Sequence, residues 1–175
     1  MLSQLTTPKN AALIAFVGTV ATLVGAWVFE YGLGYIPCAL CLKQREPYYF
    51  GIPLALATIF MVRAGYLRQA GLALIGFAAI FAYSAGFGVY HSGVEWKWWP
   101  GPADCAATRA LETDAMSLLD GLGKTTAPSC TDAALRIFGL SLAGYNFLIS
   151  AALAVITFLA GLKARQAAFL HQQEN

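Results

Sequence analysis

Four long stretches without a charged residue alternate with more polar segments along this 175-residue chain. They cover residues 11–29, 47–62, 69–90 and 137–162. A helix rises about 1.5 Å per residue, so about 20 apolar residues cross the roughly 30 Å hydrocarbon core of a bilayer. The second stretch is short, and we expect it to borrow residues from the direction of the uncharged run 31–42; we set this span at about 43–62. The pattern predicts an all-α membrane protein with four transmembrane helices in an up-down bundle.

Composition agrees with a lipid environment for most of the chain. Hydrophobic residues make up 58% and charged residues 11%, whereas soluble proteins average about 25% charged residues. The length fits one integral membrane domain over residues 1–175, and a net charge of +2 argues against a nucleic-acid partner. The first stretch exceeds a signal-peptide core and no small-x-small site follows it, so we expect a retained span.

Basic residues indicate the orientation of the bundle. Lys9 precedes the first stretch, Arg63 and Arg68 lie between the second and the third, and Lys163 and Arg165 follow the fourth. No acidic residue lies in these segments before Glu174. The segment 91–136 instead holds four basic and six acidic residues. By the positive-inside rule both termini are predicted to be cytoplasmic and loops 30–42 and 91–136 to face outward, although Lys43 and Arg45 run against this trend.

The second outward loop carries signs of a membrane interface. Trp96, Trp98 and Trp99 lie together just after the third stretch, and tryptophans gather at bilayer interfaces. Farther on, apolar residues recur at helical spacing between acids over residues 111–122. This pattern predicts a short interfacial helix in the second loop.

All four cysteines fall in the two outward loops. Cys38 and Cys41 form a CxxC pair, and Cys105 and Cys130 lie 25 residues apart in the second loop. Outside the cytoplasm such cysteines form either two structural disulfides or a redox relay. A CxxC ring is a poor staple because stabilisation grows with loop length, but it is a good redox pair because one thiol can resolve a mixed disulfide formed by the other. The local sequence therefore favours redox chemistry.

Two further points concern the surroundings of the CxxC pair. A four-thiolate zinc site is an alternative, but the second pair lacks knuckle spacing, and we predict no metal. Arg45 follows Cys41 by four residues, and a nearby cation would lower the pKa of that thiol; the alternative is a plain interfacial anchor. A helix through Cys41 and Arg45 would kink at Pro47, whereas one that begins after residue 43 would tolerate the proline, and both remain open.

Three segments together resemble the DsbB family of disulfide bond formation proteins. They are residues 37–45 (PCALCLKQR), residues 99–102 (WPGP) before Cys105, and residues 141–146 (SLAGYN). The resemblance extends over about residues 11–162. The CxxC motif alone is weak, but its combination with Arg45, two later loop cysteines and four spans is specific.

The resemblance implies a function and a set of site residues. It implies a bacterial inner-membrane thiol:quinone oxidoreductase that reoxidises a periplasmic DsbA-like thioredoxin-fold oxidase and reduces a membrane quinone, either ubiquinone or menaquinone. Cys105 would form the mixed disulfide with the partner and Cys130 would exchange with Cys38. Cys41 and Arg45 would face the quinone, with His91 near it; an interfacial histidine without chemistry is the alternative for His91.

Rival functions remain within and outside this class. The nearest is a dedicated DsbI-like paralogue that serves one partner oxidase. A non-enzymatic four-span protein with structural disulfides would have cysteines inert to thiol exchange. A vitamin K epoxide reductase-like protein is less compatible, because its CxxC belongs near the last span. The sequence contains no Gly-rich loop for a flavin or nicotinamide.

Overall fold

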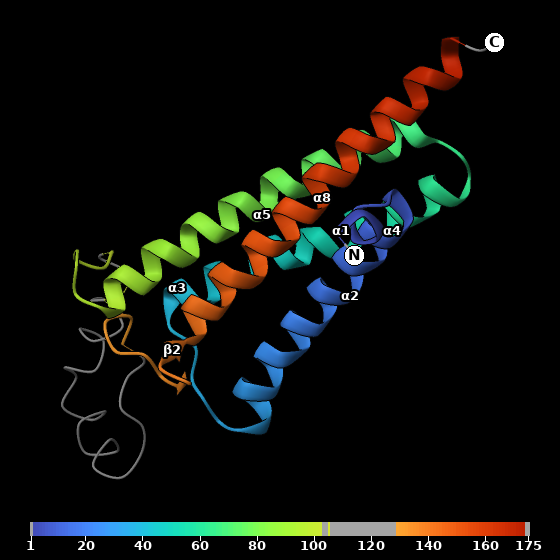
Figure 1. The fold of residues 1–175 in the computed structure, drawn as a ribbon. Coiled ribbons are helices and arrows are strands. Elements are labelled where there is room, and N and C mark those ends of the chain that lie inside the picture. The colour runs from blue at the N-terminus through green and yellow to red at the C-terminus, as the bar shows by residue number, and fades with distance from the viewer. Residues whose placement is uncertain (1, 103–104, 106–128, 174–175) are drawn as a thin grey trace, which may run out of the picture.

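The structure is a computed structural model, and it describes residues 2–102, 105 and 129–173. Helices account for most of this part of the chain (Figure 1). In chain order the elements are α1 (Leu2–Leu5), α2 (Pro8–Trp27), the π-helical turn η1 (Val28–Gly32), α3 (Ala39–Lys43), α4 (Glu46–Arg63), α5 (Leu67–Glu95), β1 (Arg136–Ile137), β2 (Leu140–Ser141) and α8 (Leu142–Gln173).

Helices α5 and α8 lie side by side along their length, and α2 packs against both α4 and α8 (Figure 1). Small residues allow the close approach of α5 and α8. A Cβ atom at Gly71 would lie 3.0 Å from the carbonyl oxygen of Gly161, and one at Gly88 would lie 2.9 Å from the backbone nitrogen of Phe147. Such backbone proximity is how helices associate where lipid provides no hydrophobic drive.

Among the described residues, three helices are long and apolar enough to cross a membrane: Pro8–Gly32, Leu67–Glu95 and Leu142–Gln173. They confirm an all-α protein with membrane-spanning character. Helix α4 is not among them, so the second of the four predicted spans stays a prediction. The predicted interfacial helix at 111–122 lies outside the described residues.

Helix ends differ from the predicted span ends for local reasons. Helix α4 begins at Glu46 with Pro47 in its first turn, where a missing N–H costs nothing, so the helix tolerates this proline without including Cys41. Helix α8 begins at residue 142, five residues later than predicted, because β1 and β2 form a tight hairpin before it. Helix α5 continues to Glu95, five residues past the predicted end, and so carries His91 on a helix rather than in a loop.

The end of α5 is closed by a Schellman motif. The N–H of Trp98 donates to the carbonyl of Gly93 at 2.9 Å and the N–H of Lys97 donates to that of Val94 at 3.0 Å. Lys97 occupies the left-handed position with φ 61°, which is usually taken by glycine. The chain therefore turns back sharply after α5, toward Cys105.

A polar network ties three helices together within the apolar core. The Tyr48 hydroxyl of α4 donates to Asn146 Oδ1 of α8 and lies 3.0 Å from Ser150 Oγ. Ser150 Oγ in turn donates to Ser84 Oγ of α5 at 3.0 Å. These bonds engage the three hydroxyls and Asn146 Oδ1 away from solvent and fix the relative rotation of the three helices.

Candidate functional site

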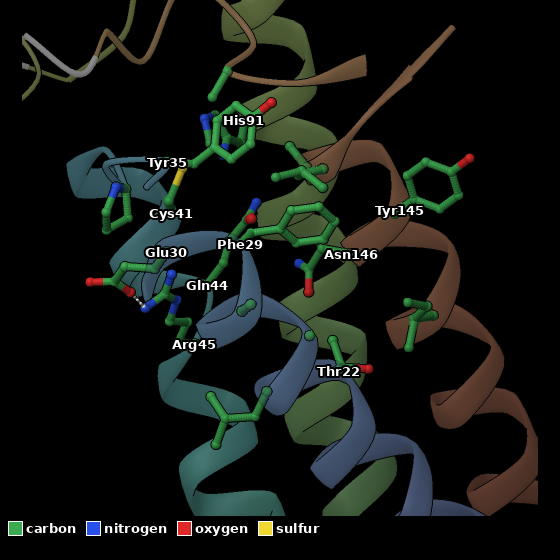
Figure 2. Close-up of a pocket in the computed structure, with 18 of the residues that line it drawn as sticks. Thr22, Phe29, Glu30, Tyr35, Cys41, Gln44, Arg45, His91, Tyr145 and Asn146 are labelled. Atoms are coloured by element: carbon green, nitrogen blue, oxygen red, sulfur yellow. Dashed lines mark hydrogen bonds and ion pairs between the residues drawn. The ribbon is translucent and has the colours of Figure 1, made fainter. Parts of the chain in front are cut away.

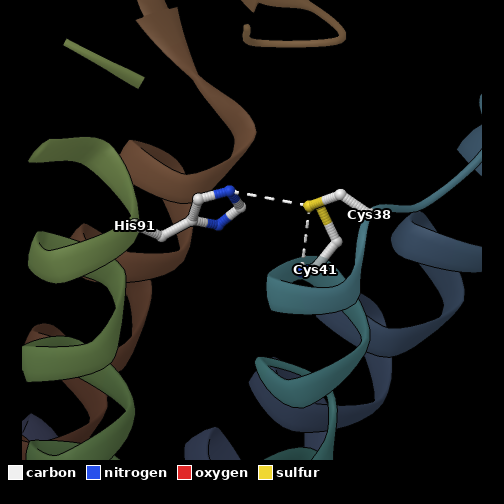
Figure 3. Close-up of side chains that lie close together, drawn as sticks. All are labelled: Cys38, Cys41 and His91. Atoms are coloured by element: carbon white, nitrogen blue, oxygen red, sulfur yellow. Dashed lines mark hydrogen bonds between the residues drawn. The ribbon is translucent and has the colours of Figure 1, made fainter. Parts of the chain in front are cut away.

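The CxxC pair forms the start of a short helix. Cys38 is the N-cap of α3, and its Sγ accepts a hydrogen bond from the backbone N–H of Cys41 at 3.2 Å. The two Sγ atoms lie 2.6 Å apart, and Cys38 is buried while Cys41 is partly exposed (Figure 3). An N-cap side chain lies over the first free N–H groups of its helix. Here the capping atom is the sulfur of Cys38, and these N–H groups favour a negative charge on it.

The two thiols of the reduced pair have unlike acidities. The hydrogen bond from the Cys41 thiol, more than any other contact, lowers the pKa of Cys38 from 9.0 to about 4, against the opposing effect of burial and with the help of His91. The same hydrogen bond and burial raise the pKa of Cys41. The geometry thus favours one thiolate, on Cys38. The expectation that Arg45 lowers the pKa of Cys41 is wrong in this structure.

His91 and Glu95 reach the cysteine pair from the last turns of α5. His91 Nε2 lies 3.7 Å from Cys38 Sγ (Figure 3) and 3.9 Å from Glu95 Oε1. Their side chains are only 2% and 6% exposed. Neither His91 Nδ1 nor Glu95 Oε2 has a hydrogen-bond partner among the described residues. His91 is therefore buried beside the cysteine pair, and its chemical role stays a prediction.

The second cysteine pair packs against the first. Cys105 and Cys130 form a disulfide. Cys130 is 2% exposed and belongs to the same buried cluster as Cys38, Leu40 and Val94, with Cys41 and Cys105 at its edge. All four cysteines therefore gather in one cluster, which brings a disulfide next to a pair of free thiols.

Trp99 anchors the segment before Cys105 to the end of α5. Trp99 Nε1 donates to the backbone carbonyl of Tyr90 at 2.9 Å, and the two rings stack with centroids 6.2 Å apart. A Cβ atom at Gly93 would lie 2.0 Å from the Trp99 ring, so only glycine fits there. The Trp99 clasp, defined as Tyr90, Gly93 and Trp99, fixes the segment that leads to Cys105.

A cavity of about 550 Å³ opens beside the CxxC pair (Figure 2). Its walls are mostly apolar and come from α2, η1, the α3–α4 junction, the end of α5 and the start of α8. Cys41, Arg45 and His91 line it, as do Glu30, Gln44, Glu95 and Asn146. The sequence-predicted Cys41, Arg45 and His91 thus share one cavity.

Arg45 is held at the wall of this cavity by an acid that sequence reasoning missed. Its guanidinium forms an ion pair with Glu30 of η1, and the two side chains are 12% and 19% exposed (Figure 2). The available signal was a lone acid directly after 19 uncharged residues. Gln44 Nε2 and Asn146 Nδ2, also missed, are buried donors without a partner among the described residues.

The site could also be considered for a metal ion, because the ligand atoms of Cys38, Cys41 and His91 lie within 4.8 Å of one another. Tetrahedral zinc with Zn–S bonds of about 2.3 Å separates two sulfur ligands by roughly 3.7 Å. The 2.6 Å between the Sγ atoms is much shorter and is close to bonding contact. The disulfide between Cys105 and Cys130 also rules out a shell of four thiolates here.

Comparison with known proteins gives consistent relatives. Residues 8–160 match the family described as disulfide bond formation protein DsbB. The chain is 30% identical over 168 residues to disulfide bond formation protein B of Saccharophagus degradans, covering 93% of this chain and 98% of that protein. It is 28% identical over 149 residues to the uncharacterised protein RP370 of Rickettsia prowazekii, covering 84% of each. No solved structure matches. The chain belongs to the DsbB family of membrane-bound, disulfide-forming oxidoreductases.

Proposed function

We propose that this protein is a thiol:quinone oxidoreductase that reoxidises a periplasmic DsbA-like oxidase and passes the electrons through its two cysteine pairs to a membrane quinone. Family membership supports the disulfide-forming activity. The observation that carries the finer proposal is the single buried cluster that contains all four cysteines. A purely structural disulfide has no need of two free thiols packed against it.

The proposed electron path is a series of thiol–disulfide exchanges. A thiolate of the reduced partner attacks Cys105, and Cys130 leaves as a thiolate. Cys130 then attacks Cys38 of the oxidised inner pair, and Cys41 leaves. The partner's second thiol resolves its mixed disulfide with Cys105, and closure of the Cys105–Cys130 bond releases Cys38. Two electrons thereby pass from the partner dithiol to the inner pair.

The low pKa of Cys38 suits its place in this path. A thiol of lower pKa leaves faster in exchange, so the release of Cys38 from Cys130 is favoured. The presence of Cys38 and Cys130 in one buried cluster supports the assignment of these two sulfurs as exchange partners.

The cavity residues fit a quinone. The walls are apolar, and Gln44 and Asn146 supply unpartnered buried N–H groups, which match the carbonyl acceptors of a quinone ring. Arg45 would add a charged donor, while Cys41 and His91 line the same space. A bound quinone, ubiquinone or menaquinone, would accept the two electrons and two protons that leave the inner pair.

We further propose that α4 is the fourth span, that both termini are cytoplasmic, and that both cysteine loops face the periplasm of a bacterial inner membrane. The Lys and Arg distribution supports this orientation. A membrane-impermeant thiol reagent applied to intact cells should label reduced Cys105 and Cys130 without permeabilisation. Labelling that requires permeabilisation would contradict the orientation.

The decisive experiment mixes purified protein in detergent with a reduced thioredoxin-fold oxidase and a soluble quinone analogue. Loss of quinone absorbance should require all four cysteines. Replacement of the exposed Asp132 by Asn, a change in the same loop outside the cluster, should have no effect. Cysteines that fail to exchange with any reduced thioredoxin-fold protein would identify a membrane protein with structural disulfides instead.

A further inference from the structure

Glu95 is a buried carboxyl group that the exchange path does not use. Its side chain is 6% exposed, and Oε2 has no partner among the described residues. It lines the cavity beside the CxxC pair. Burial of a carboxylate carries a large desolvation cost unless a positive group compensates it. Its position therefore points to a compensating cation.

The only ion pair of Glu95 among the described residues is with His91. The two residues are one turn apart on α5, so their side chains project from the same face. His91 Nε2 faces Glu95 Oε1 at 3.9 Å and Cys38 Sγ at 3.7 Å. One ring nitrogen thus lies between a carboxylate and the sulfur that the site favours as a thiolate. A proton on this nitrogen would be attracted to both.

We propose that Glu95 is a positioning residue that keeps His91 in the imidazolium form beside Cys38, so that the His91–Glu95 pair holds the proton given up by Cys38. This inference rests on the proposed redox role of the inner cysteine pair. It assigns Glu95 as the partner of His91 and explains why this acid is buried.

Protons and electrons balance over one cycle. Two electrons from the partner dithiol break the Cys38–Cys41 bond, and two protons are taken up. One proton stays on the Cys41 thiol and the other on the His91 imidazole, which leaves Cys38 as a thiolate. When the bond forms again, two electrons leave for the acceptor and both protons leave with them.

The other described titratable groups around the cavity contact partners other than His91. Those that line it, besides His91 and Glu95, are Glu30, Tyr35, Cys41, Arg45, Tyr48 and Tyr145. Arg45 is paired with Glu30, Tyr48 bonds to Asn146, and Tyr145 donates to the carbonyl of Ile137. Within the part of the chain that the structure describes, Glu95 is therefore the acid that can act on His91.

The test uses a variant in which Cys38 is the only cysteine: Cys41→Ser, Cys105→Ala and Cys130→Ala. Serine at 41 keeps a hydroxyl donor for the Cys38 sulfur. The rate of alkylation by iodoacetamide is measured in detergent from about pH 2 to 9, because the pKa of Cys38 is about 4 in the reduced pair. The product is identified by mass. Addition of Glu95→Gln should raise the midpoint of this profile by about one pH unit, because Cys38 loses part of the effect of a nearby cation. Glu95→Asp should raise it less.

The sign of the shift separates this role from a simple charge effect. A negative charge that acted only through space would raise the pKa of nearby thiols, as Glu95 does for Cys41, so its removal would lower the midpoint. In a His91→Ala background, Glu95→Gln should no longer raise the midpoint. Glu46→Gln is the matched control, since Glu46 is exposed and contributes no effect at Cys38.

Three outcomes would overturn the inference: an unchanged midpoint, a lower midpoint, or the same rise with and without His91. If Glu95→Gln fails to fold, the Glu95→Asp profile decides in the same way. The assay contains neither quinone nor partner protein. Its failure would leave the proposed quinone reduction standing, and a failure of quinone reduction would leave this proton assignment testable.

Discussion

The Glu30–Arg45 ion pair provides the sharpest energetic prediction. Replacement of Glu30 by Gln keeps the size of the side chain but leaves the Arg45 guanidinium, which is 12% exposed, without its counter-charge. Loss of one partner of a fully buried pair costs about 3–5 kcal/mol. Because both side chains keep some contact with solvent, we expect a loss of about 2 kcal/mol in the free energy of unfolding.

A double-mutant cycle measures this coupling. Glu30→Gln, Arg45→Gln and the double variant are unfolded in mixed detergent micelles, with helix content followed by circular dichroism. The double variant should lose about 1–2 kcal/mol less than the sum of the singles, since it leaves no unpaired charge. The matched control is the Lys97–Asp132 pair, in which both side chains are 73% exposed. Its coupling should stay below about 0.5 kcal/mol. Additive losses at Glu30 and Arg45 would refute the reasoning.

Four further predictions concern activity and stability. Arg45→Met should slow quinone reduction by less than about 100-fold, and Arg45→Lys should slow it less than Arg45→Met does. Unchanged kcat and KM in Arg45→Met would show that Arg45 is only an interfacial anchor. Cys105→Ser should abolish oxidation of the partner but spare quinone reduction by a small dithiol, and equal loss of both would contradict two separate steps. The pKa of Cys38 is about 4 in the folded protein against an ordinary value of 9.0, so its thiolate should stabilise the reduced protein increasingly from pH 4 to 9. This stabilisation should be lost as the pH falls toward 4. Thermal unfolding measures it, and the form with a Cys38–Cys41 disulfide is the control, which should show no such pH dependence. Gly93→Ala should displace the Trp99 ring, cost about 1–3 kcal/mol and shift tryptophan fluorescence; an unchanged spectrum would argue against the clasp.

The sequence predicted the helices better than their ends. Hydrocarbon requires every backbone polar group to bond internally, so uncharged stretches of sufficient length must be helical, and three of the four are confirmed as candidate spans. The ends depend on local caps. The Schellman motif at Lys97 extends α5 to Glu95, and the hairpin at 136–141 delays α8. Neither leaves a clear mark in hydrophobicity.

The sequence predicted those features of the candidate site that depend on residues close together in the chain. The CxxC spacing and the location of all four cysteines in two loops indicated redox chemistry without knowledge of the fold. Glu30 and Arg45 are 15 residues apart on different elements, so their pairing depends on how η1 packs beside α4. The contact of Cys38 with His91 spans 53 residues and depends on tertiary packing in the same way. Arg45 was therefore assigned to Cys41, four residues before it in sequence, whereas it forms an ion pair with Glu30 of η1.

The sulfur that exchanges electrons is also the group that caps α3. Cys38 Sγ accepts the N–H of Cys41, and α3 has only five residues. A helix this short is marginal without its cap. When Cys38 is bonded to Cys130, its sulfur loses its charge and must turn toward the second loop, so the first turn of α3 should fray. Exchange intermediates in which Cys38 is bonded to Cys130 would then show faster hydrogen–deuterium exchange at the amide of Cys41. This rate would distinguish trapped intermediates from one another.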